Sequence, residues 1–249
     1  MKYLLSMSAR NEAESIADVI SGFRLKAQEM GLVLQIHVVD DGSTDLTMAR
    51  AISAGASMYR FQAPVGLAAA FNKELSLAVE SGADYVIHID ADGQHSPYDL
   101  PKFIQKTLDG YDLILGNRLH IRPEFFADWQ YHGNIFLSEV VSALIGKCIT
   151  DSQTGYRVFS RALATAIRIK GTITYTQEQI VRAVHGSFSI TEIPVLTYPR
   201  RYGTSRVVSD PLNYLACVFR DLQSLARELG LTLSRVPGAT HAEDICGQV

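Results

Sequence analysis

The chain has 249 residues, of which 47% are hydrophobic and 20% are charged, a composition typical of a folded globular protein. A formal net charge of -3 argues against a nucleic-acid-binding surface as its main purpose. The sequence contains neither a run of about eighteen apolar residues nor a signal-peptide pattern, so we expect no transmembrane helix and a cytoplasmic location.

Strand and helix patterns alternate along the first half of the chain. Apolar runs predict strands over 3–7, 32–39, 57–61, 85–89 and 113–116, and amphipathic segments predict helices over 11–27, 43–54, 66–80 and 97–108. Asn11 and Glu14 have the spacing of a capping box, and Ser43 or Thr44 can cap the second helix. This alternation predicts βαβ units and a mainly parallel sheet.

The second half of the chain is less regular. Its patterns predict helices over 126–145, 176–184 and 210–229, and one strand over 188–196. No internal repeat or obvious linker divides the sequence, so we expect one α/β domain.

The most informative motif follows the strand that ends at residue 89. Asp90, Asp92 and Gln94 alternate along the chain, so an extended backbone would direct all three side chains to one face. Oxygen ligands at the carboxyl end of a parallel strand suit Mg²⁺ or Mn²⁺ shared with a substrate's phosphates. A bound cation would also remove the repulsion between the two carboxylates. The plain alternative is an acidic turn without a ligand.

This motif is one of six short motifs along the chain. They are the segments 6–12 (SMSARNE), 38–45 (VVDDGSTD), 90–95 (DADGQH), 116–118 (GNR), 151–157 (DSQTGYR) and 201–206 (RYGTSR). Together they closely resemble family 2 glycosyltransferases of GT-A fold, in the branch of dolichyl-phosphate mannose synthase and other polyprenyl-phosphate glycosyltransferases. The resemblance covers about the first 210 residues.

The resemblance implies a Rossmann-like GT-A fold, with a mainly parallel mixed sheet flanked by helices in a single domain. That domain would span residues 1–230, with a nucleotide-sugar half over about 1–118 and an acceptor half over about 119–230. We expect residues 231–249 to form a loose tail, because they lack periodicity and contain proline and glycine.

The same resemblance assigns the donor residues. It implies that Ser8, Arg10, Glu12 and Asp40 hold the base and ribose of a nucleotide diphosphate sugar, for which the two carboxylates can accept hydrogen bonds. Asp41 is interpreted as part of a helix cap or turn.

The metal is expected to be Mg²⁺ or Mn²⁺. Asp92 would be its direct ligand and Gln94 a second one. Asp90 would approach the metal, directly or through water, or the nucleotide and sugar.

The acceptor residues are also implied by the resemblance. Arg118, Arg201 and Arg206 occupy positions where the family binds acceptor phosphate or diphosphate, a task that suits the planar guanidinium fork. For each arginine, a solvated surface position is the alternative. Asp151 would lie near the sugar and acceptor, and it is the candidate general base if the acceptor is a hydroxyl group.

The expected reaction is an inverting, metal-dependent transfer of a hexose from a GDP- or UDP-sugar to a polyprenyl or dolichyl phosphate. Such an acceptor is already anionic and needs no general base. One alternative is a family 2 transferase with a soluble sugar or polysaccharide acceptor, and another is a non-catalytic nucleotide-sugar-binding protein.

Membrane contact is a separate hypothesis. Apolar residues spaced by three and four over 210–229 predict an amphipathic helix. Its apolar face would either pack on the protein's own core or dock on a membrane or a membrane protein, which would place the chain on the cytoplasmic face of a membrane.

Overall fold

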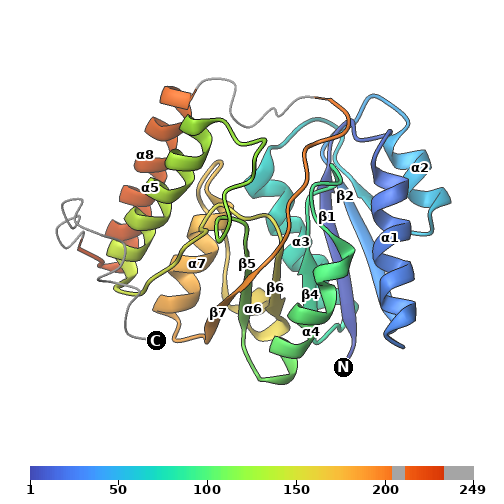
Figure 1. Ribbon diagram of the computed structural model, residues 1–249, viewed down its shortest axis with the longest axis horizontal. Helices are drawn as coiled ribbons and strands as arrows, with labels where there is room; N and C mark the ends of the chain where they lie inside the picture. Colours follow the sequence, from blue (N-terminus) through green and yellow to red (C-terminus); the bar gives the residue numbers. More distant parts are fainter. Residues whose placement is uncertain (204–210, 233–249) are drawn as a thin grey trace.

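Seven strands form one mixed sheet in the computed structural model, which describes residues 1–203 and 211–232 (Figure 1). In sheet order they are β3 (Ser57–Arg60), β2 (Leu34–Asp40), β1 (Tyr3–Ala9), β4 (Tyr85–His88), β6 (Arg157–Ser160), β5 (Leu113–Asn117) and β7 (Ile190–Pro194). The pairs β2–β3, β1–β2, β1–β4 and β5–β7 are parallel, whereas β6 runs antiparallel to both β4 and β5. This is the mainly parallel mixed sheet that the sequence predicted.

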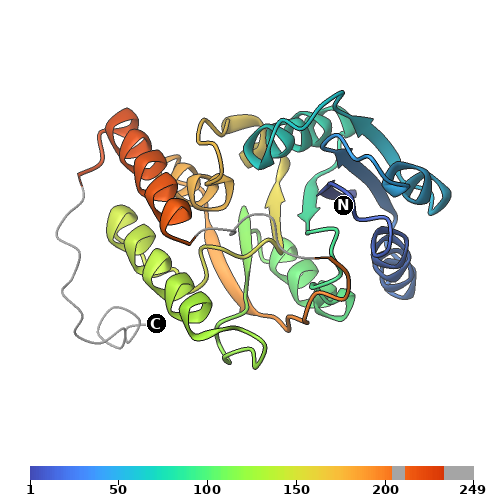
Figure 2. The same ribbon diagram turned by 90° about the horizontal axis from the view of Figure 1, so that it is seen from above.

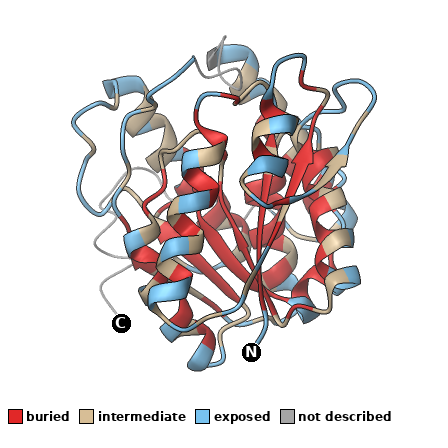
Figure 3. Ribbon diagram, turned by 90° about the vertical axis from the view of Figure 1, so that its right-hand side faces the viewer, coloured by how far each residue is buried: buried red, intermediate tan, exposed pale blue. Residues whose placement is uncertain are grey.

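Helices cover both faces of the sheet (Figure 2). Their bounds are α1 (Ile16–Glu29), α2 (Thr47–Ser53), α3 (Leu67–Ser81), the 3₁₀ helix η1 (Pro97–Asp99), α4 (Leu100–Leu108), α5 (Asp128–Ile145), α6 (Arg161–Ala166), α7 (Tyr175–His185) and α8 (Pro211–Leu229). Alternate strand residues point to opposite faces. Leu4 and Val86 therefore pack in a cluster with α3, α5, α6, α7 and α8, whereas Leu5 and Ile87 pack in another with α1, α2 and α4. Figure 3 shows the sheet buried between these layers.

Two helices begin later than the sequence predicted. Asn11 has a φ of 52°, and its side-chain oxygen accepts a hydrogen bond from the backbone N–H of Thr44 at 2.8 Å. It therefore joins two loops, and the predicted capping box with Glu14 does not form, since α1 begins at Ile16. The second helix begins at Thr47, whose N–H donates to Asp45 at 2.9 Å, so neither Ser43 nor Thr44 caps it.

The amphipathic helix α8 packs on the protein itself. Val218, Leu222 and Leu225 are buried in the cluster formed with α5 and α7. The rings of Phe136 and Phe219 lie 6.0 Å apart, and α5 and α8 run side by side in both views (Figures 1 and 2). None of the helices in the described part of the chain combines the length and apolar character needed to cross a bilayer.

Candidate active site

A cavity of about 460 Å³ opens at the carboxyl ends of β1 and β4. In the sheet, β2 lies on one side of β1 and β4 lies on the other, so the strand order reverses between β1 and β4. The cavity therefore lies at a topological switch point, where α/β sheets bind ligands. Six of the predicted donor and metal residues line it, namely Ser8, Arg10, Glu12, Asp90, Asp92 and Gln94. Other lining residues come from the start of α3, from α7, from Gln153 and Gly155, and from Arg200.

The two carboxylates of the strand-end motif have opposite electrostatic environments. His95 Nε2 lies 3.1 Å from Asp90 Oδ2. Burial acts to raise the pKa of Asp90, but the hydrogen bond from His95 and nearby positive charges outweigh it and hold that pKa below its usual range. Burial and the charge of Asp90 raise the pKa of Asp92. The ionised form of Asp92 is therefore the less favoured one, and a cation would stabilise it.

Gln94 supports this turn from both its backbone and its side chain. Its N–H donates to Asp92 Oδ1 at 3.0 Å, and its side-chain amide donates to the carbonyl of Tyr198 at 3.0 Å. The motif is thus tied to the 198–202 segment, which passes beside the cavity. The Gln94 amide oxygen remains a suitable ligand for a hard cation.

Gly155 lies directly against Asp90. A Cβ atom added at this position would overlap the Asp90 carboxylate. The glycine of the 151–157 motif therefore allows the segment after β4 and the segment before β6 to approach closely at the cavity.

Arg200 is a site residue that the sequence prediction missed. It lines the cavity, forms an ion pair with Glu12, and places Nη1 3.8 Å from Asp92 Oδ2. Arg201, the predicted residue, lines a neighbouring cavity of about 540 Å³ with Tyr98 and Tyr202. Residue type could not separate two consecutive arginines. Arg206 lies outside the described residues.

Asp40 and Asp41 lie on different sides of the chain. Asp40 is fully buried, accepts a hydrogen bond from the N–H of Ser43 at 2.9 Å and pairs with Arg60 at 3.3 Å. Asp41 lines the cavity and accepts hydrogen bonds from the N–H groups of Val65 and Gly66 at 2.6 and 3.2 Å. Asp41 therefore fixes the segment that leads into α3, whereas Asp40 faces the interior.

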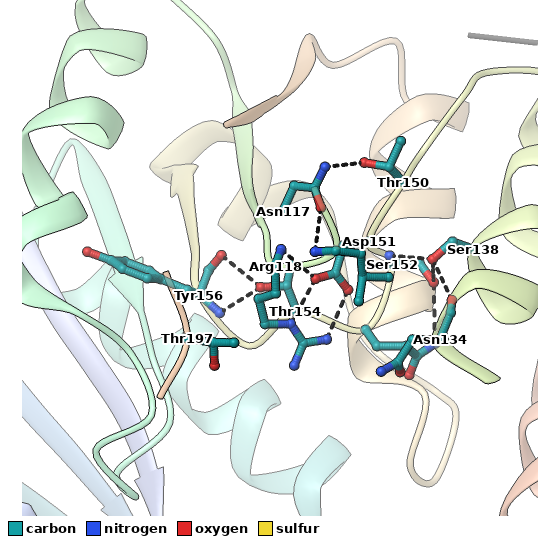
Figure 4. A network of polar contacts seen from close by, with 12 residues as sticks. Asn117, Arg118, Asn134, Ser138, Thr150, Asp151, Ser152, Thr154, Tyr156 and Thr197 are labelled. Carbon is teal, nitrogen blue, oxygen red and sulfur yellow. Dashed lines mark hydrogen bonds and ion pairs between the residues drawn. The ribbon is translucent and has the colours of Figure 1, made fainter. Parts of the chain in front are cut away.

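Arg118 and Asp151 form a close ion pair (Figure 4). Neither residue is part of the cavity lining. Arg118 Nε and Nη2 donate to the two oxygens of Asp151 at 2.8 and 2.9 Å, and the Arg118 backbone N–H donates at 3.0 Å. Burial acts to lower the pKa of Arg118, but Asp151 outweighs it and raises that pKa. Glu192 accepts the N–H of Asp151 at 3.0 Å. Asp151 is thus engaged as an anchor for the loop after β5.

The donor set suits a divalent cation that is shared with a substrate. Mg²⁺ and Mn²⁺ are commonly held by one or two carboxylates together with phosphate oxygens. In residues 1–203 and 211–232, no three histidine, cysteine, aspartate or glutamate side chains group as a metal site. Asp90, Asp92 and Gln94 all line the cavity, and they are the residues that could hold such a cation together with the phosphate oxygens of a substrate.

The fold and the cavity are those of a GT-A glycosyltransferase, an α/β domain with an acidic pair at the switch point of its sheet. Residues 5–168 match the family model described as "Glycosyl transferase family 2", which covers more than half of the chain. The chain therefore belongs to glycosyl transferase family 2.

Similar proteins agree with this assignment. The glycosyltransferase AglJ of Haloferax volcanii is 30% identical over 220 residues, covering 87% of this chain and 69% of the relative. A dolichyl-phosphate hexose transferase of the same organism is 26% identical over 227 residues, covering 91% of this chain and 95% of the relative. Glucosyl-3-phosphoglycerate synthase from Mycobacterium tuberculosis, solved with Mn²⁺, UDP and glucosyl-3-phosphoglycerate, has a TM-score of 0.68 at 20% identity. That alignment covers 93% of this chain and 81% of the synthase, and it supports the fold.

Proposed function

We propose that this glycosyltransferase transfers a hexose from a GDP- or UDP-sugar to a polyprenyl or dolichyl phosphate, with inversion and with Mg²⁺ or Mn²⁺. The observation that carries the proposal is the Asp90–Asp92 pair in a cavity that also contains Arg200. One relative, a dolichyl-phosphate hexose transferase that aligns over 95% of its length, supports the acceptor class.

The donor would lie across the carboxyl ends of β1 and β4. In this proposal Ser8, Arg10 and Glu12 contact the base and ribose, and Asp40 shapes the loop behind them. Asp92 and Gln94 would hold the cation, with Asp90 directly or through water. The cation would supply charge neutralisation for the diphosphate as it leaves.

The acceptor needs cationic residues rather than a base. An acceptor phosphate oxygen forms the new bond to the anomeric carbon, the bond to the donor diphosphate breaks, and inversion follows from attack on the opposite face. A phosphate is already ionised, which agrees with an Asp151 whose carboxylate is engaged by Arg118. We propose Arg118, Arg200, Arg201 and Arg206 as the residues that attract this phosphate.

The location would follow from the acceptor. A lipid phosphate is held in a membrane, so the enzyme would work as a peripheral protein at the cytoplasmic face. Since α8 buries Val218 and Leu222 in the core, membrane contact would use other surface residues.

The decisive experiment measures hexose transfer with Mn²⁺, using UDP-glucose and GDP-mannose as donors and dolichyl phosphate as acceptor. We expect a dolichyl-phosphate sugar, no product in EDTA, and no product from Asp92→Ala. Asp109→Ala is the matched control, because Asp109 lies beyond the end of α4 and contacts Gln105 and Lys106 on that helix. Transfer to octyl glycosides but not to dolichyl phosphate would contradict the proposed acceptor and indicate a transferase that uses a soluble sugar acceptor. Donor binding without any transfer would indicate a non-catalytic protein.

A further inference from the structure

Four polar side chains form a hydrogen-bonded chain beneath the cavity. Ser8 Oγ donates to Glu74 Oε1, Glu74 Oε2 lies 2.9 Å from His88 Nδ1, and His88 Nε2 lies 3.3 Å from Tyr175 Oη. Ser8 and Tyr175 line the cavity from β1 and α7, whereas Glu74 and His88 are 0% and 2% exposed. The buried pair therefore connects two lining residues of the candidate donor site, one on β1 and one on α7.

Glu74 fixes the direction of the hydrogen bond from Ser8. A carboxylate has no hydrogen to donate, so both of its bonds run toward it, from the Ser8 hydroxyl and from His88 Nδ1. A serine hydroxyl has a single hydrogen. Once that hydrogen is used by Glu74, Ser8 Oγ can offer only its lone pairs to a ligand in the cavity.

This polarity excludes one kind of ligand group and selects another. Phosphate oxygens are acceptors, and a serine oxygen backed by a buried carboxylate would repel them. A hydroxyl group of a sugar can donate its hydrogen to Ser8 Oγ. The part of the cavity next to Ser8 is thus suited to a hydroxyl group rather than to the diphosphate.

We propose that Ser8 is a specificity residue that accepts a hydrogen bond from a hydroxyl group of the nucleotide sugar, and that Glu74 is the positioning residue that sets this polarity. The hydroxyl belongs either to the ribose or to the hexose. This inference rests on the proposed function, because it requires a nucleotide-sugar donor in the cavity. His88 holds Glu74 in place through the second carboxylate oxygen.

Fluorinated ligands can test hydrogen-bond polarity directly. A C–F group can accept weakly but cannot donate, so it replaces a hydroxyl only where the protein is the donor. The probes are UDP and GDP with 2′-deoxy or 2′-deoxy-2′-fluoro ribose, and UDP-glucose and GDP-mannose with deoxy or deoxyfluoro substitutions around the hexose. Dissociation constants with Mn²⁺ are measured by calorimetry, without any acceptor.

For the wild-type protein, at one hydroxyl position the deoxy and the deoxyfluoro probes should both bind about tenfold more weakly than the hydroxyl probe, the scale of one hydrogen bond. The ribose and hexose series identify which hydroxyl it is. Ser8→Ala should make the three probes at that position bind equally. Ser8→Thr keeps the hydroxyl and should restore the discrimination.

Glu74→Gln tests the positioning role at nearly constant volume. The new amide can donate to Ser8 Oγ, which frees the serine hydrogen for the cavity, so the deoxyfluoro probe should bind better than the deoxy probe. Ser76→Ala is the matched control on the same helix, because Ser76 is exposed and its Oγ donates to the carbonyl of Asn72. It should bind all probes as the wild type does. If Glu74→Gln does not fold, the comparison of Ser8→Ala with Ser8→Thr still decides the proposal.

Two results would overturn the inference while leaving the proposed function intact. One is a wild-type protein that binds the deoxyfluoro probe as tightly as the hydroxyl probe at every position where the deoxy probe binds more weakly. The other is a Ser8→Ala variant that retains the wild-type discrimination. If none of the nucleotide probes binds the wild-type protein, the proposed function itself is wrong, and the inference falls with it.

Discussion

Asp92 carries a charge that the fold disfavours. Because burial and Asp90 raise the pKa of Asp92, the folded chain holds a proton at this site more tightly than the unfolded chain does. Ionisation of Asp92 therefore lowers the free energy of unfolding as the pH rises from the ordinary aspartate pKa toward the raised one. A site that binds a cation can tolerate this penalty, since the ion removes it.

The first prediction concerns Asp92→Asn in the presence of EDTA. Without a metal, this variant should be more stable than the wild type at pH 7 by about 1 kcal/mol, or about 2–4 °C in Tm. The advantage should shrink as the pH falls toward about 4, because the wild-type carboxyl group then becomes neutral. Urea unfolding across this pH range measures it, and a constant difference would contradict the electrostatic cause. The variant should also lose stabilisation by Mn²⁺.

Gly155 provides a second prediction. Gly155→Ala should displace the Asp90 carboxylate and reduce metal-dependent turnover by at least about tenfold, the scale of a misplaced catalytic group. Gly22→Ala is the control, because a Cβ at Gly22 would meet only ordinary contact at 3.5 Å from Pro97. Initial rates with saturating Mn²⁺ compare the two variants. Equal activity of Gly155→Ala and wild type would show that the contact with Asp90 is unimportant.

Two pairs of neighbours mark the limit of sequence reasoning at this scale. Asp40 and Asp41 are consecutive in the 38–45 motif, and Arg200 directly precedes Arg201 at the start of the 201–206 motif, but only Asp41 and Arg200 line the cavity. Successive residues of an extended chain point to opposite sides. A motif therefore locates the pair, whereas the choice within it depends on the register, which is fixed by packing of the whole strand.

Asp151 and Arg118 connect two loops at the scale of secondary-structure elements. Their ion pair joins the end of β5 to the segment that leads into β6, and Glu192 on β7 holds the same segment. A buried ion pair of this geometry stabilises only while both partners are present. Each loop is thus positioned by the other.

The third prediction is a double-mutant cycle on this pair. Asp151→Ala should lower the free energy of unfolding by about 3–5 kcal/mol, because it leaves a buried arginine without its partner. Arg118→Met should also destabilise, and the double variant should lose less than the sum, with a coupling above about 1 kcal/mol. Urea unfolding measures all four proteins. Strict additivity would mean that the pair does not anchor the loops.

Helix α8 yields the fourth prediction. Leu222→Ala should lower the free energy of unfolding by about 2–5 kcal/mol, since Leu222 is 4% exposed in the core cluster. Leu212→Ala, on the same helix, should change it by less than about 0.5 kcal/mol, because Leu212 is 79% exposed. Guanidinium unfolding compares these matched substitutions. If Leu222→Ala left the free energy of unfolding unchanged, the apolar face of α8 would not contribute to the core, and docking on a membrane or a membrane protein would be favoured.

Most of the elements could be predicted from periodicity, but β6 and α6 could not. β6 consists of four residues, Arg157–Ser160, and its arginine is fully buried. Arg157 is tolerated there because it donates to the carbonyls of Thr154 and Thr176 and to Gln179. Arginine normally indicates a surface position, so the sequence of this segment does not read as a buried strand. The two antiparallel pairings of β6 could therefore not be predicted either.

For the molecule as a whole, ligand binding should appear as added stability. Mn²⁺ with UDP or GDP at about a hundred times the dissociation constant should add about 2.7 kcal/mol, or about 5–10 °C in Tm. Asp92→Ala should lose the metal-dependent part, whereas Asp109→Ala should retain it. Differential scanning fluorimetry with and without EDTA provides the comparison. An unchanged Tm with every nucleotide would argue against a donor site in this cavity.

The contact of Arg200 with Glu12 and Asp92 has a consequence for the order of substrate binding. While the guanidinium neutralises these two acids, it offers less charge to an incoming anion. A cation and donor that bind to the acids would release Arg200 toward the second substrate. Initial-rate kinetics should therefore follow a compulsory sequence in which the donor binds first. The same arginine would thus make the affinity for the acceptor depend on the presence of the donor.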